Sequence, residues 1–179
     1  MKSFLHTVAA IGRRHACILA GGILCFSTAS WAHGNHTHGH GTARLVVDGP
    51  TLAVTLDVPL ESYLGYDYPP GDDAQQKTWA DFRARLADPL RFVEPAADAQ
   101  CAVRDAKTSP NLDAADAQAD IDNLVLEIRF TCARPEALKS VGFTAFREHP
   151  GLKQLRVQVK NGATRKTLTV RPRFPAVMF

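Results

Sequence analysis

The sequence predicts a single α+β domain in which an antiparallel sheet of about five to six strands carries two helices on one face. Three observations support this class. Apolar and polar residues alternate without a break over residues 124–132, as in a half-buried strand. The dipeptide Asn161-Gly162, a strong hairpin-turn signal, joins two further alternating segments. Residues 73–86 instead place their apolar side chains at helical spacing.

The remaining elements are predicted from the same signals. In chain order we expect strands over 42–48 and 52–58 joined by a Gly-Pro turn, a helix over 73–86, a short extended segment over 91–93, strands over 101–105 and 124–132, a helix from Pro135 to about Arg147, and a final hairpin of 153–159 and 164–171. Asp73 can cap the first helix, with Trp79 and Phe82 on its inner face. Residues 106–120 show no convincing period, which predicts a surface loop.

The first 32 residues have the composition of an export signal. Lys2, Arg13 and Arg14 supply positive charge, and an apolar run comes next that is too short for a membrane span. The sequence Ser30-Trp31-Ala32 then places small residues at the two positions that a signal peptidase inspects. We therefore expect residues 1–32 to be cleaved, which leaves a periplasmic protein without a membrane span.

The charge balance depends on this cleavage. The whole chain has 21 basic and 18 acidic residues, for a net charge of +3. The predicted signal holds three cations and no acid, so its removal leaves 18 of each sign. A nucleic-acid-binding protein needs a basic face or stripe, and a neutral chain gives no support for a nucleic-acid partner.

Cleavage also removes two of the four cysteines and leaves Cys101 and Cys132. An even pair in an exported protein predicts a disulfide. Closing a loop of about 30 residues should stabilise the fold by roughly 3–4 kcal/mol on the chain-entropy estimate. A zinc site on the two cysteines is the alternative, although neither belongs to a C-x-x-C pair.

Four of the seven histidines lie within eight positions directly after the predicted cleavage site: His33, His36, His38 and His40. Neutral imidazole is the commonest protein ligand for zinc and also suits copper and nickel. A histidine-rich tract is by composition typical of metal binding. We expect residues 33–41 to be a flexible metal-binding amino terminus before a domain over 42–179. The alternative is a disordered tail without a function.

Two ligand arrangements are open. In the first, His36, His38 and His40 surround zinc together with a carboxylate or water, the usual tetrahedral set. In the second, His33 becomes the new terminus, and its free amine and its own imidazole chelate one ion. The second arrangement favours copper, for which nitrogen sites generally have the highest affinity among the divalent first-row metals.

A series of short motifs, in a fixed order along residues 38–179, resembles one family. The motifs are the histidine tract that leads into the first strand (His38–Val47), Leu64-Gly65-Tyr66-Asp67 after the first hairpin, a lone Cys101, a strand that ends in Phe130-Thr131-Cys132, a proline-led helix with Phe146 and Pro150, and a final hairpin. On these residues the chain resembles the ZrgA-like family of zinc-regulated periplasmic zinc-binding proteins. The resemblance implies zinc as the metal, a role in zinc acquisition or buffering, and a periplasmic zinc uptake component as a partner.

Further candidate ligands lie in the body of the chain. They are Asp67, Asp113, Asp116, Asp120, Asp122 and His149. The alternative is that the aspartates belong to solvated loops and that His149 is a helix-end residue. The resemblance implies histidines where this chain has Tyr68 and Gln118, so the metal prediction depends mainly on the amino-terminal tract.

The sequence contains no recognisable catalytic motif. It lacks His-Glu-x-x-His, a Gly-x-Ser-x-Gly elbow and a glycine-rich phosphate loop. We therefore expect that the protein is not an enzyme. A non-catalytic envelope interaction module, in which the histidines are incidental, remains the alternative from another functional class. It predicts full function after the tract is deleted.

Overall fold

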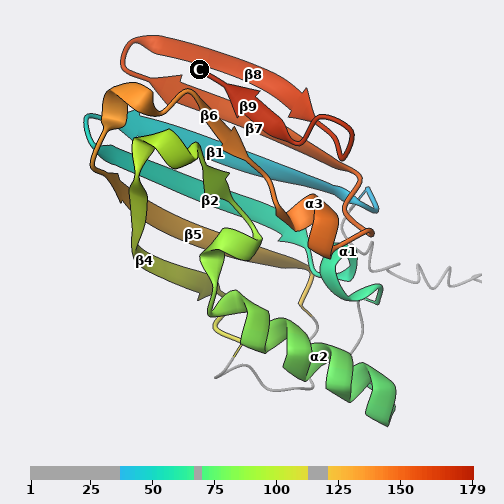
Figure 1. The fold of residues 1–179 in the computed structure, drawn as a ribbon. Coiled ribbons are helices and arrows are strands. Elements are labelled where there is room, and N and C mark those ends of the chain that lie inside the picture. The colour runs from blue at the N-terminus through green and yellow to red at the C-terminus, as the bar shows by residue number, and fades with distance from the viewer. Residues whose placement is uncertain (1–36, 67–69, 113–120) are drawn as a thin grey trace, which may run out of the picture. The chain divides into compact units, whose positions relative to one another are not determined.

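The computed structural model describes residues 37–66, 70–112 and 121–179 (Figure 1). Residues 33–179 form one compact unit, to which all the described strands and helices belong. The expected export signal lies outside the described residues.

Six strands form the main sheet, in the order β4-β5-β2-β1-β7-β8. Their bounds are β1 (His40–Asp48), β2 (Thr51–Pro59), β4 (Cys101–Ser109), β5 (Asn123–Cys132), β7 (Gln154–Asn161) and β8 (Thr164–Val170). Every neighbouring pair is antiparallel except β1 and β7, which run parallel. The sheet is therefore mixed, and the prediction of a purely antiparallel sheet is wrong on this point.

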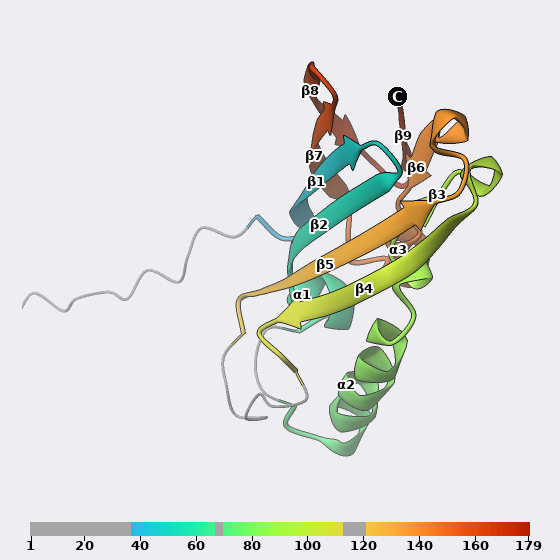
Figure 2. The same ribbon diagram turned by 90° about the vertical axis from the view of Figure 1, so that its left-hand side faces the viewer.

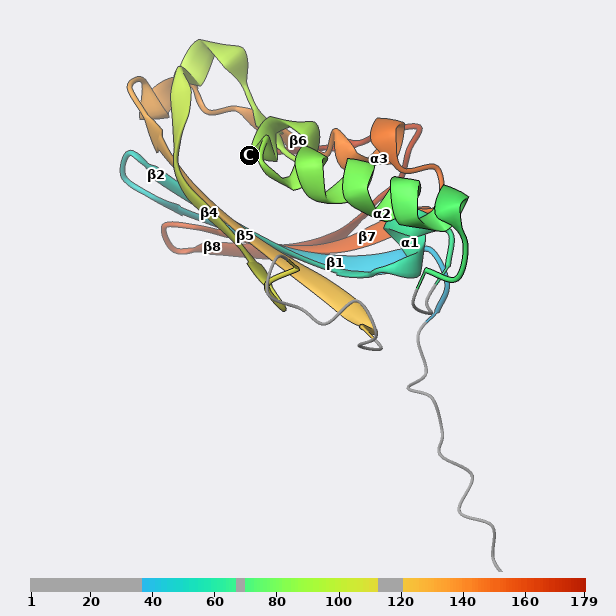
Figure 3. The same ribbon diagram turned by 90° about the horizontal axis from the view of Figure 1, so that it is seen from below.

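A smaller sheet and the helices lie on one face of the main sheet (Figures 2 and 3). The smaller sheet has the order β3-β6-β9, with β3 (Glu94–Pro95), β6 (Ser140–Gly142) and β9 (Ala176–Met178). The helices are α1 (Glu61–Leu64), α2 (Asp73–Leu86) and α3 (Ala145–Glu148), with 3₁₀ turns η1 (Pro89–Arg91), η2 (Ala97–Ala99) and η3 (Pro135–Ala137).

The first predicted long helix is confirmed as α2. Its N-cap is Asp72 rather than Asp73, because the Asp72 carboxylate accepts a hydrogen bond of 2.8 Å from the amide of Gln75. Phe82 is buried, and Trp79 and Leu86 pack against the core from the same face.

The prediction of a second long helix, from Pro135 to Arg147, is wrong. The segment instead forms η3, then β6, then the four-residue α3. Its apolar residues are buried as expected, but Val141 and Gly142 pair with β3 on one side and β9 on the other. A β-branched residue followed by glycine is a poor helix interior, and the strand pairing decides the outcome. The extended segment expected over 91–93 is likewise replaced, because Arg91 ends η1 and the strand begins at Glu94.

The core lies between the main sheet and this covering layer. Alternate residues of β2 and β5 are buried, as the period of two predicts. At one end of the β4–β5 pair, Cys101 and Cys132 stand directly opposite each other and form the predicted disulfide. The other face of the main sheet is not covered by any described helix or strand (Figure 3), and this face carries the polar residues of the alternation.

Candidate metal centre

The last described part of the histidine tract is a tight turn at the start of β1. The amide of His40 donates a hydrogen bond of 3.0 Å to the carbonyl of Thr37, and Gly39 takes a φ of +76°. Glycine is the residue that adopts this left-handed conformation without strain. The turn places the side chain of His38 at its corner, where 82% of it is exposed.

The turn is held to the body of the fold by its glycine. The carbonyl of Gly39 accepts hydrogen bonds from the amides of Lys153 and Gln154, at 2.7 and 3.0 Å. A Cβ at position 39 would lie 2.7 Å from the carbonyl oxygen of Gly151. His38 and His40 therefore flank a backbone anchor to the segment that leads into β7.

Glu61, the first residue of α1, lies next to this turn. A Cβ at Gly151 would lie 2.6 Å from the carbonyl oxygen of Ser62, so that the segment at Gly151 packs backbone against backbone on α1. Gly39 in turn packs on Gly151. This succession of close contacts brings the Nδ1 atom of His38 into contact with the carboxylate of Glu61, whose side chain is only 18% exposed.

The contact between His38 and Glu61 determines which imidazole nitrogen is available to a ligand. A carboxylate only accepts hydrogen bonds, so Nδ1 of His38 is the atom that carries the hydrogen. In the neutral imidazole the lone pair is then on Nε2. Histidines that bind metals usually have this arrangement, with the second nitrogen donating to a carboxylate that fixes the tautomer and the ring orientation.

His40 lies on the uncovered face of the sheet, beside a polar hollow of about 290 Å³. Asp57 and Asn123 also line this hollow, and the Asn123 side-chain amide donates a hydrogen bond of 2.8 Å to the Asp57 carboxylate. The Oδ1 atom of Asn123 is buried and has no hydrogen-bond partner among the described residues. The hollow thus brings the side chains of Asp57 and Asn123 close to the imidazole of His40.

Asp122 belongs to the same end of the sheet. Its carbonyl accepts a hydrogen bond of 3.0 Å from the amide of Leu60, the residue before Glu61. The end of the predicted acidic loop therefore reaches the strand end that carries Glu61. The other predicted ligands in loops and in the tract lie outside the described residues: His33, His36, Asp67, Asp113, Asp116 and Asp120.

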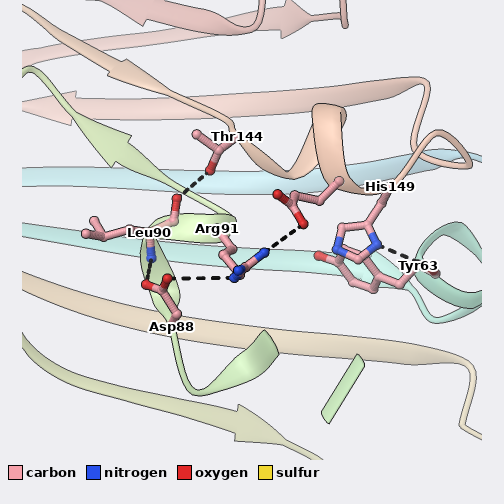
Figure 4. Close-up of polar contacts among 7 residues, drawn as sticks. Tyr63, Asp88, Leu90, Arg91, Thr144 and His149 are labelled. Atoms are coloured by element: carbon pink, nitrogen blue, oxygen red, sulfur yellow. Dashed lines mark hydrogen bonds and ion pairs between the residues drawn. The ribbon is translucent and has the colours of Figure 1, made fainter. Parts of the chain in front are cut away.

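His149, the remaining candidate ligand, lies in the core directly after α3. Its side chain is 2% exposed, and its ring packs against Tyr63, Phe82 and Phe92. Figure 4 shows the ring beside Tyr63, whose carbonyl lies 3.3 Å from Nδ1. Burial lowers the pKa of His149 below its ordinary value of 6.5, so the neutral form is favoured. These surroundings are those of a core residue.

Within residues 37–66, 70–112 and 121–179, no group of three or more His, Cys, Asp or Glu side chains is placed to hold a metal ion. Among the described residues, the candidate site consists of the pair of His38 and Glu61, with His40 nearby on the strand. Glu61 was not predicted from the sequence. It stands 23 residues from His38, and no local pattern links the two.

A model of the ZrgA family, described as a zinc uptake protein family, matches residues 35–179. No curated protein matches the chain. In the part of the chain that the structure describes, no helix has the length and apolar character needed to cross a membrane.

Proposed function

Because the chain belongs to the ZrgA family of zinc uptake proteins, we propose that it is an exported, periplasmic and non-catalytic protein that binds zinc and assists zinc uptake. Zinc is the cargo in this proposal. Binding takes place at the amino-terminal histidine tract, which the protein uses to buffer the ion or to pass it to an uptake component.

The contact of His38 with Glu61 carries this proposal. The acid holds Nδ1, so Nε2 faces solvent as a ready zinc ligand. Zinc takes four ligands from nitrogen, sulfur and oxygen donors. We assign the others to His36, His40 and a carboxylate or water, with Asp67 and the acidic loop as sources of the carboxylate. His33 completes a tract in which several imidazoles compete for the same ion.

This arrangement fits a carrier better than a permanent structural site. Structural zinc sites are closed by four protein ligands, whereas His38, the proposed first ligand, lies at an exposed turn. A turn that is anchored through Gly39 and open at His38 offers zinc a defined first ligand and leaves a route for release.

A competitive titration tests the proposal. Residues 33–179, with His33 as the free amino terminus, are titrated with zinc and, in parallel, with copper against a chromophoric chelator. The variant for comparison has alanine at His33, His36, His38 and His40. We expect sub-micromolar zinc affinity that is lost in the variant, with unchanged thermal unfolding of the metal-free protein.

Other outcomes are decisive against parts of the proposal. Zinc binding that survives in the variant moves the site into the body of the fold. Copper is the metal instead of zinc if copper binds tightly and zinc only loosely, and if blocking the amino group of His33 abolishes the copper binding. If deletion of the gene lowers cellular zinc and a chain without the tract restores it, the tract has no role in uptake.

A further inference from the structure

The uncovered face of the main sheet carries its charges unevenly. On the half formed by β4 and β5, cations are neutralised across the strands. Lys107 pairs with Glu127 at 2.9 Å, and Arg129 lies 4.0 Å from the carboxylate of Asp105. These pairs are the ordinary arrangement for an exposed sheet face, because opposite charges on neighbouring strands stabilise the pairing.

The half formed by β1, β7 and β8 differs. Four exposed cations alternate onto this face: Arg44, Arg156, Lys160 and Arg165. None of them forms an ion pair with a carboxylate of the described residues. The three strands contain a single acid, Asp48 at the end of β1. This half of the face therefore has an excess of positive charge, although residues 33–179 as a whole are neutral.

Two of the cations are placed directly against each other. Lys160 on β7 is the register partner of Arg165 on β8. Like charges in directly opposite positions destabilise a strand pair. Beside them lies a hollow of about 390 Å³ that Arg44, Gln158 and Thr167 also line. We call this hollow, together with the three cations Arg44, Lys160 and Arg165 that line it, the basic hollow.

The basic hollow adjoins an edge of the sheet. β8 is the outermost strand on this side, and among the described strands only β7 pairs with it. An edge strand presents unpaired backbone amide and carbonyl groups to a further strand. A peptide in extended conformation can satisfy these groups, and its alternate side chains then lie over the same face as Arg165 and Lys160. A lipid head group supplies negative charge but no strand pairing.

We propose that the outer edge of β8 and the basic hollow beside it form a docking surface for an extended, acidic segment of a partner polypeptide. Backbone pairing with β8 supplies the alignment, and the carboxylates of the segment neutralise Lys160, Arg165 and Arg44. The docking surface contains none of the residues assigned to zinc, so the inference does not depend on metal binding and goes beyond the proposed function.

The test uses metal-free protein (residues 33–179 with chelator), which separates it from the zinc titration. The probe is a fluorescein-labelled twelve-residue peptide of alternating Glu and Thr, followed by fluorescence anisotropy at low ionic strength. Its counterparts contain Gln in place of Glu, or N-methyl groups at alternate residues. We expect the Glu peptide to bind and its binding to weaken with salt. Both counterparts should bind at least about tenfold more weakly.

Two protein variants complete the test, and each of them removes two positive charges. The double variant K160Q/R165Q should weaken binding of the Glu peptide by about tenfold. It should fold at least as stably as the parent, because it removes a like-charge pair. The matched variant K107Q/R129Q removes two cations from the other half of the face and should change binding by less than about twofold.

Three results would overturn the proposal. Equal weakening in both variants would indicate attraction by net charge alone. Undiminished binding of the N-methylated peptide would exclude pairing with the edge of β8. Absence of peptide binding, together with binding to vesicles of phosphatidylglycerol and phosphatidylethanolamine that K160Q/R165Q abolishes, would make the basic hollow a membrane-contact surface.

Discussion

The imidazole of His149 is stacked on the ring of Phe92, with 5.6 Å between the ring centroids and 18° between the planes. Nε2 of His149 is buried without a partner among the described residues. A proton added to this ring would therefore be a charge inside an aromatic cluster, which explains why its pKa is lowered by burial.

From this position we predict that the protein loses stability in mild acid. In the unfolded chain His149 titrates near its ordinary pKa of 6.5, and in the folded chain it titrates lower. As the pH falls below about 6.5, the unfolded state takes up the proton first, so the free energy of unfolding falls until the lower folded-state pKa is passed. Each unit of difference between the two pKa values contributes about 1.4 kcal/mol. Urea unfolding between pH 8 and pH 5 measures this dependence.

The variant H149F should flatten the pH dependence, because phenylalanine fits an aromatic cluster and carries no titratable group. H40A is the control. It removes an exposed histidine and should keep most of the slope. An unchanged slope in H149F would assign the acid sensitivity to other groups.

For Glu61 we predict a loss of zinc affinity without a loss of fold. E61Q keeps the shape of the side chain but no longer offers a carboxylate to Nδ1 of His38. Removal of such a supporting carboxylate typically lowers metal affinity by about 10- to 100-fold. The chelator titration measures this change, and E94Q, at an exposed acid on β3, is the control that should bind zinc like the parent. If E61Q and E94Q bind zinc with equal affinity, Glu61 does not contribute to the site.

The anchor at Gly39 gives a third prediction. G39A would introduce a Cβ 2.7 Å from the Gly151 carbonyl and 2.8 Å from Cγ of Lys153, at a φ of +76°. We expect a loss of about 2–3 kcal/mol in the free energy of unfolding, from backbone strain and displaced neighbours together. Zinc affinity should fall as well, because the turn would shift away from Glu61.

G49A is the matched control for this loss. Gly49 also has a positive φ, +53°, but a Cβ there would meet nothing within 4 Å. Only the strain of the left-handed conformation applies, about 1–2 kcal/mol, and zinc affinity should not change. If the two variants lose the same stability and both bind zinc normally, the contact with Gly151 does not position the turn.

The disulfide gives a fourth prediction, on stability alone. Cys101 and Cys132 are 31 residues apart in the chain and join β4 to β5. Replacing both by serine should lower the free energy of unfolding by about 3–4 kcal/mol on the chain-entropy estimate. The double variant should keep most of the zinc affinity of the parent, because His38, His40 and Glu61 lie outside the segment that the disulfide closes. A drop in affinity measured on the folded variant would contradict that separation.

Local patterns in the sequence predicted several elements of the fold. The turn at Asn161-Gly162, the alternation of β5 and the helix α2 all appear in the structure within a few residues of their expected bounds. The turn and the helix are stabilised largely by neighbours in the chain, such as Asp72 at the start of α2. β5 is instead paired with β2 and β4, and it was predictable because one of its faces is buried and the other is not.

The errors arise where distant segments decide the structure. The segment from Pro135 to Arg147 has apolar residues that suit a helix, but Val141 is paired on both sides by strands that lie far away in the chain. The parallel pairing of β1 with β7 has no signal in either strand. For the same reason the sequence predicted His38 as a ligand but not Glu61, because their contact depends on the packing of Gly39 on Gly151 and of Gly151 on Ser62.

The place of β1 in the sheet has a consequence for the order of events during synthesis. β1 is the first of the described strands, but it lies between β2 and β7. The turn that precedes it is held by Lys153 and Gln154, more than a hundred residues downstream. A nascent or truncated chain thus has its histidines but lacks the anchor that orients them. It should bind metal only as loosely as a histidine-rich peptide. If the tract binds zinc as proposed, tight capture of the ion requires a folded carboxy-terminal third, so that only a finished molecule competes for zinc.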